Sequence, residues 1–68
     1  MPNFAWYYMD TANDTCYWCY SNEMSVTDFA SVVSSKTGKR ISASDTSHAS
    51  NNKDLERHKG YASHCIHV

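Results

Sequence analysis

The chain has 68 residues, a net charge of −1, three Cys, and two Trp, five Tyr and two Phe. A chain this short buries only about 60% of the surface of its unfolded form, so we expect one domain with a small core. The near-neutral charge and the aromatic content argue against a disordered chain, while the few aliphatic residues indicate that a metal, disulfides or a partner subunit stabilises the fold.

The first ten residues, MPNFAWYYMD, contain no Lys or Arg, and their apolar run is too short for a signal peptide or a membrane span. We therefore expect an intracellular protein, cytoplasmic or nuclear and not secreted, with no membrane partner. Thiols in such a compartment are normally reduced, and three Cys cannot all pair within one chain. Metal binding is thus favoured over a disulfide framework.

Most of the aromatic residues fall within the first twenty positions, in two runs on either side of Asn13 and Asp14. Two aromatic-rich runs separated by turn-forming residues are typical of a β-hairpin. The pattern predicts an N-terminal hairpin, with Cys16 and Cys19 near its turn.

The next segment predicts an amphipathic helix over residues 26–36. Ser25 and Asp28 form a start signal, and Gly38 after Lys36 supplies a stop. The apolar residues have the i, i+3, i+4, i+7 spacing of one helical face: Val26, Phe29, Ala30 and Val33.

Residues 42–52 are almost all small and polar, without helical or strand periodicity, and predict an exposed loop. Residues 52–59 predict a short helix that is capped by Asn52 and ended by Gly60. The chain as a whole predicts a small α+β domain stapled by zinc.

Two Cys separated by two residues, Cys16 and Cys19, have the spacing at which a turn presents two thiolates to one zinc ion. The other ligands would come from the C-terminal tail, which contains His58, His64 and Cys65. We expect His58 as the third ligand, and either His64 or Cys65 as the fourth. His48 and His67 are expected to be solvated.

Cys16-x2-Cys19, followed by Leu55-x2-His58-x5-His64, resembles the two-Cys, two-His zinc fingers, and the five-residue gap is similar to the matrin-type, double-stranded-RNA-binding branch. The chain departs from the family in having 38 residues between Cys19 and His58, where about a dozen are usual. The resemblance covers about fifteen residues and implies structural zinc, nucleic-acid binding and His64 as the fourth ligand. The softness of a thiolate instead favours Cys65.

A Cys-x-x-Cys redox couple works at the start of a helix in a βαβ unit, which the residues before Cys16 do not predict. A catalytic zinc site needs a general base in a dry pocket, and the chain has only two Glu, Glu23 and Glu56. We therefore expect a protein that is not an enzyme.

All six Lys and Arg lie after residue 35. Such a segregation predicts a basic face that contacts phosphates, while exposed aromatic rings stack on bases. The resemblance to the zinc fingers implies RNA before DNA as the partner. The candidate phosphate contacts are Lys36, Lys39, Arg40, Arg57 and Lys59, and the candidate stacking or docking rings are Tyr17, Trp18 and Tyr20.

The sequence pI of about 6.4 is far from that of a dedicated nucleic-acid binder, so a second hypothesis is a protein-protein interaction module or small inhibitor. Aromatic residues are enriched in protein interfaces, and the N-terminal aromatic cluster would then be the docking surface. A homodimer, in which a second copy covers this cluster, is a form of the same hypothesis.

Overall fold

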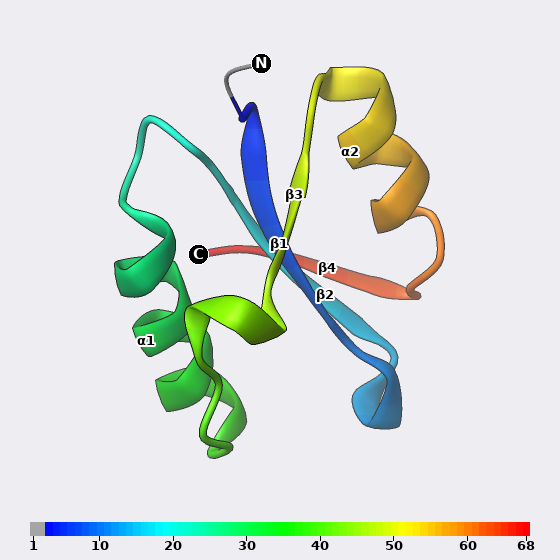
Figure 1. Ribbon diagram of the computed structural model, residues 1–68. Coiled ribbons are helices and arrows are strands. Elements are labelled where there is room, and N and C mark those ends of the chain that lie inside the picture. Colours follow the sequence, from blue (N-terminus) through cyan, green and yellow to red (C-terminus); the bar gives the residue numbers. More distant parts are fainter. Residues whose placement is uncertain (1–2) are drawn as a thin grey trace.

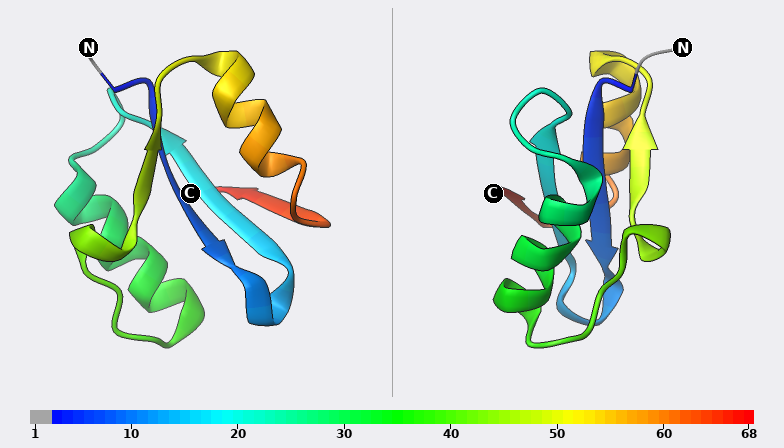
Figure 2. Two further views of the ribbon diagram at one scale, coloured as in Figure 1. Left: turned by 45° about the vertical axis from the view of Figure 1, so that its right-hand side comes forward. Right: turned by 60° about the vertical axis from the view of Figure 1, so that its left-hand side comes forward.

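The computed structural model describes residues 3–68 as a four-stranded mixed sheet with one helix on each face (Figures 1 and 2). The order of strands in the sheet is β3-β1-β2-β4. The strands are β1 (Ala5–Asp10), β2 (Thr15–Tyr20), β3 (Ser47–Ala49) and β4 (His64–His67). The helices are α1 (Val26–Thr37) and α2 (Asn52–Lys59), with short 3₁₀ turns η1 (Thr11–Asn13) and η2 (Ala43–Asp45). The predicted α+β class is confirmed.

The predicted N-terminal hairpin is confirmed as β1 and β2, which pair antiparallel from Ala5 opposite Tyr20 to Asp10 opposite Thr15. The tight connection requires a left-handed residue, and Asp14 takes this conformation with φ of 52°. Cys16 and Cys19, which were predicted near the turn, both lie inside β2.

Helix α1 confirms the predicted amphipathic helix and extends it by one residue. The Ser25 side chain accepts a hydrogen bond from the Asp28 amide at 3.1 Å, and Gly38 ends the helix with φ of 73°. Phe29, Ala30 and Val33 are buried, as the helical spacing predicted.

Helix α2 has the predicted bounds, but its cap is Asn51 and not Asn52. The Asn51 side chain accepts from the Asp54 amide at 2.8 Å, which makes Asn52 the first helical residue. Leu55 is the buried residue of this helix. Within residues 3–68, no helix has the length and apolarity to cross a membrane.

The prediction of an exposed loop over residues 42–52 was wrong. This segment contains η2 and the edge strand β3, whose three residues pair antiparallel with β1. Ala49 is fully buried opposite Ala5, and both pack with Leu55 of α2. Small side chains at these two positions let α2 lie close to the sheet. A strand of three residues is too short to show an alternating pattern.

The C-terminal strand β4 was not predicted either. It pairs parallel with β2, and all four of its residues are exposed. The C-terminal end of β4 is held by stacking of His67 on Trp18, with ring centroids 4.1 Å apart, and by a contact of 2.7 Å between His67 Nε2 and the Glu23 carboxylate.

Strand β2 supplies side chains to two separate cores, because successive residues of a strand point to opposite faces. On the face covered by α2, which we call the α2 face, Trp18 packs with Ala5, Ala49 and Leu55. On the opposite α1 face, Tyr17 and Cys19 pack with residues of α1, Phe29 and Val33. Residues 15–19 of β2 are therefore all buried.

We predict that Leu55→Ala lowers the free energy of unfolding by about 2–5 kcal/mol, because it leaves a cavity between α2 and the sheet. A chain of this size is expected to have a total stability of only about 3–10 kcal/mol. Urea denaturation followed by Trp fluorescence measures the loss. Ile66→Ala is the control, since Ile66 is already 39% exposed, and an equal loss in both variants would contradict the assignment of Leu55 to the core.

Candidate functional site

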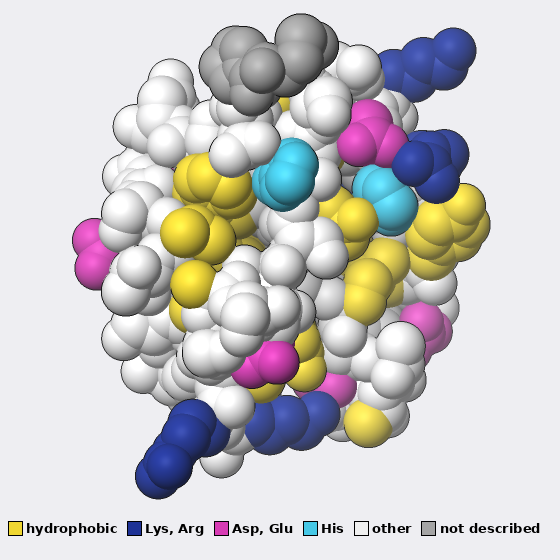
Figure 3. Space-filling view, viewed as in Figure 1, with side chains coloured by type: hydrophobic (Ala, Val, Ile, Leu, Met, Phe, Trp, Pro, Cys, Tyr) yellow, Lys and Arg dark blue, Asp and Glu magenta, His cyan; other side chains and the backbone are white. Residues whose placement is uncertain are grey.

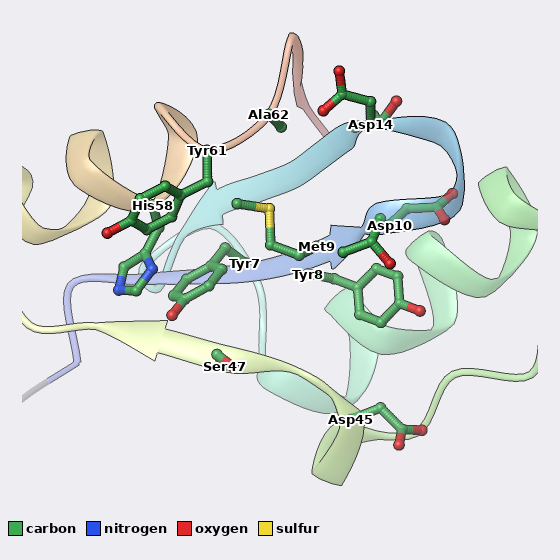
Figure 4. Close-up of a pocket in the computed structure, with 12 residues that line it drawn as sticks. Tyr7, Tyr8, Met9, Asp10, Asp14, Asp45, Ser47, His58, Tyr61 and Ala62 are labelled. Carbon is green, nitrogen blue, oxygen red and sulfur yellow. The ribbon is translucent and has the colours of Figure 1, made fainter.

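A hollow of about 440 Å³ lies beside β1, where β3 begins (Figure 4). β3 pairs with β1 only from Ala5 to Tyr7, so residues 8–10 of β1 extend past it. The hollow is bounded by this part of β1, by Ser47 at the start of β3, and by His58 and Tyr61 at the end of α2. We call it the β1 groove.

The β1 groove contains a free stretch of strand edge. The Val68 amide donates to the Trp18 carbonyl at 2.9 Å, so even-numbered β2 residues direct their backbone groups to β4 and odd-numbered ones to β1. The odd-numbered β2 residues lie opposite even-numbered β1 residues, so the even-numbered residues of β1 face β2. Odd-numbered residues therefore face the other way, where Tyr7 meets Ser47 of β3. Met9 faces the same way, beyond the end of β3, so its N–H and C=O point to the groove.

Aromatic rings form one wall of the groove. The His58 ring stacks on Tyr7 with centroids 4.4 Å apart, and the Tyr61 ring meets His58 edge-on at 6.0 Å. His58 Nε2 also lies 3.4 Å from the Asp54 carboxylate and 3.2 Å from Arg57 Nη2, so ring and side-chain contacts together hold this ring. Burial raises the pKa of Tyr7, so its phenol stays neutral. Tyr61 is 66% exposed and is the outer ring of the wall, and its hydroxyl accepts a hydrogen bond from Arg57 at 3.4 Å.

Three carboxylates line the groove, and no Lys or Arg side chain does. Asp10 is buried and accepts hydrogen bonds from Asn13 at 2.8 Å and from Lys39 at 3.0 Å, and these bonds lower its pKa. Asp14 and Asp45 are exposed. Their pKa values are also lowered, by hydrogen bonds from Ser63 and Ser42 respectively, so both are charged at neutral pH.

The predicted zinc pair is not brought together. Cys16 and Cys19 are three residues apart in a strand, so their side chains point to opposite faces of the sheet. Both are fully buried, and burial raises the pKa of each thiol to about 11. In this arrangement they do not form the two-thiolate half of a site.

The tail residues do not complete a site either. His58 lies against Tyr7 at the end of α2, and the consecutive residues His64 and Cys65 of β4 point to opposite faces. Over residues 3–68 no three His, Cys, Asp or Glu side chains gather in a way that could hold a metal ion. The five candidate ligands, as they are placed here, therefore do not fit a structural zinc site. Zinc binding itself stays a prediction.

The predicted phosphate contacts do not form one face. Figure 3 shows the Lys and Arg side chains in two separate places, at the bottom and at the upper right of this view. Three of the five candidates are paired with carboxylates: Lys39 with Asp10 at 3.0 Å, Arg57 with Asp54 at 2.6 Å and Lys59 with Glu56 at 2.9 Å. Lys36 and Arg40 are both exposed near the end of α1. Nucleic-acid binding stays a prediction.

The candidate stacking rings are largely inside the fold. Tyr17 and Trp18 are only 8% and 9% exposed, and Lys59 Nζ lies 4.3 Å from the centroid of a Trp18 ring. Tyr20 is half-buried and meets Trp18 edge-on at 5.1 Å. These rings build the two cores, and stacking on a base would require them to leave their packing.

Sequence reasoning missed the groove residues Tyr7, Met9 and Tyr61. The groove exists because β3 is short and begins opposite Tyr7, and no local pattern in residues 42–52 revealed a strand. The cluster of aromatic residues in β1 did indicate this region of the chain. It could not show which rings lie in a core and which line a surface.

The chain matches no known protein family, no curated protein and no solved structure.

We predict that the Asp10–Lys39 pair stabilises the fold above the ordinary Asp pKa of about 4 and that this contribution is lost as pH falls. The sign follows from the lowered pKa of Asp10 in the folded state, since the unfolded chain takes up the proton first. Urea midpoints of wild type and Asp10→Asn should therefore differ most at pH 6–7 and converge toward pH 2. A difference that does not change with pH would contradict this assignment.

Native mass spectrometry of protein prepared with zinc, with and without a chelator, tests the metal prediction. This arrangement predicts that the chelator leaves the fold in place, because the core around β2 is packed without a metal. One stoichiometric zinc ion whose removal unfolds the chain would contradict this arrangement, because residues 3–68 bring no metal-binding group together.

Proposed function

We propose that this protein is a non-enzymatic protein-interaction module that binds an extended, basic segment of a partner protein in the β1 groove. The observation that carries the proposal is the free edge of β1 at Met9, set beside a hollow with aromatic and acidic walls. Adding a strand to an exposed sheet edge is a common mode of peptide recognition.

The backbone at Met9 supplies the first part of the recognition. A partner strand that continues the line of β3 would accept a hydrogen bond from the Met9 N–H and donate one to its C=O. Hydrogen bonds of this kind hold any extended sequence. The affinity for a particular sequence must therefore come from side chains.

The aromatic wall supplies an apolar surface for the partner side chains. Tyr61 is mostly exposed, while Tyr7 and His58 are fixed by stacking, so little side-chain entropy is lost when a peptide covers them. Exposed aromatic anchors of this type are enriched among residues that dominate binding energy. This placement assigns the docking role to Tyr7 and Tyr61, and not to Trp18 or Tyr20.

The charge of the groove selects the partner. Asp14 and Asp45 leave a net negative charge at its rim, because Asp10 is already neutralised by Lys39. A Lys or Arg of the partner would lie beside these carboxylates, whereas a phosphate backbone would be repelled. This is the reason to favour a protein over the RNA predicted from the sequence.

A phage-displayed library of random octapeptides tests the proposal, because no partner sequence is assumed. We expect enrichment of extended sequences that carry Lys or Arg, with amide shifts at Met9 and Ser47 when an enriched peptide is added to ¹⁵N-labelled protein. Tyr61→Ala should weaken binding by about tenfold or more. Ile66→Ala is the matched control, since Ile66 is an exposed apolar residue on the other edge of the sheet.

Two outcomes would contradict the proposal. The first is a library without enrichment, or peptides whose binding is unchanged in Tyr61→Ala. The second is a gel shift with single-stranded or duplex RNA that is abolished by Lys36→Glu and Arg40→Glu, because these residues lie outside the groove. The second result would restore the nucleic-acid hypothesis.

A further inference from the structure

The side chains of Cys16 and Cys65 lie next to each other on the α2 face of the sheet. The two residues are register partners in the parallel pair of β2 and β4. Neighbouring strands are about 4.8 Å apart, which falls within the range of Cα separations found in disulfides, about 4.4–6.8 Å. The backbone therefore already has the spacing that a disulfide requires.

The next register pair on the same face shows that partners on these strands meet directly. Two residues further along, Trp18 and His67 stack with ring centroids 4.1 Å apart and an interplanar angle of 7°. Because alternate residues share a face, Cys16 and Cys65 have the same relation to each other as Trp18 and His67. Cys65 Sγ donates to the Lys59 carbonyl, so it must leave this hydrogen bond to form a bond with Cys16.

The two thiols differ in exposure. Cys65 is exposed, and its Sγ donates to the Lys59 carbonyl at 3.3 Å, whereas Cys16 is fully buried beneath it. Cys19 is also buried, but it lies on the α1 face with Phe29 and Val33. An oxidant therefore reaches Cys65 first. Of the two other thiols, Cys16 is the one that can react with the oxidised Cys65 in the folded protein, because it lies on the same face.

We propose that Cys16 and Cys65 form an intramolecular disulfide when the folded protein meets a disulfide oxidant such as glutathione disulfide. The Cys65 thiolate attacks one sulfur of glutathione disulfide, forms a mixed disulfide and releases one glutathione thiolate. The Cys16 thiolate then attacks the Cys65 sulfur and releases the second. Overall the two protein thiols lose two electrons and two protons, and glutathione disulfide is reduced to two glutathiones.

The burial of Cys16 determines how fast the second step runs. Burial is the main reason why the pKa of the Cys16 thiol is raised to about 11 in the reduced protein. At pH values below this pKa, the thiolate fraction of Cys16 increases about tenfold with each unit by which the pH increases. The disulfide should therefore close up to about a hundredfold faster at pH 9 than at pH 7.

The expected consequence is a staple between the C-terminal strand and the centre of the sheet. All four residues of β4 are exposed, and β4 pairs with one strand only. A bond to Cys16 closes a chain loop that contains α1, β3 and α2. Disulfides that close long loops stabilise small domains, and we expect the melting temperature to rise by roughly ten degrees.

The test is to incubate the folded protein with glutathione disulfide at pH 8.5, quench with acid, alkylate free thiols in denaturant and map the peptides by mass spectrometry. We expect a loss of about 2 Da in the intact chain before alkylation, a peptide that links Cys16 to Cys65, and alkylation of Cys19. Cys19→Ser should form the same link. Cys65→Ser, which alters an exposed position, should keep its circular dichroism spectrum and form no link.

Three results would overturn the proposal. One is a stable glutathione adduct on Cys65 with Cys16 still free at pH 9. Another is a bond that includes Cys19, and the third is a bond only between two chains. Each of these is distinguished by the peptide map, and none depends on whether the β1 groove binds a peptide.

Discussion

The two-residue period of strand β2 is the constraint on which the rest of the structure depends. A helix covers each face of the sheet, so every residue from Thr15 to Cys19 is buried. Even-numbered residues of β2 point to the α2 face, and odd-numbered residues point to the α1 face. Trp18 reaches Leu55 on one face, while Tyr17 reaches Phe29 on the other. A shift of one residue would exchange the two cores, and the differing sizes of their partners fix the register.

The same constraint explains which parts of the fold could be predicted. Helix α1 was predictable because its cap, its apolar spacing and the final Gly38 are all local signals. The hairpin was predictable because its aromatic runs are long. Strands β3 and β4 were not, since they have three and four residues and form only because β1 and β2 offer edges to them. Their pairing is decided by tertiary contacts.

The candidate site was harder to predict than the fold. The spacing of Cys16 and Cys19 is suitable for a metal when it lies in a turn, but in a strand it separates the two side chains. The Cys spacing was read correctly, but the two Cys lie in a strand and not in the turn that a metal site needs. The β1 groove, in contrast, has no motif at all, because it results from the place where β3 begins and from the rings of His58 and Tyr61 that lie beside it.

The central claim is that β2 is a strand with alternate residues in opposite cores, and a NOESY spectrum of the folded protein tests it most directly. The account predicts contacts of the Trp18 ring with Leu55 and His67, contacts of the Tyr17 ring with Phe29, and none between Trp18 and Phe29. The same contacts should persist with a chelator present. Contacts that place Cys16 and Cys19 on one side of the chain, or Trp18 beside Phe29, would contradict it.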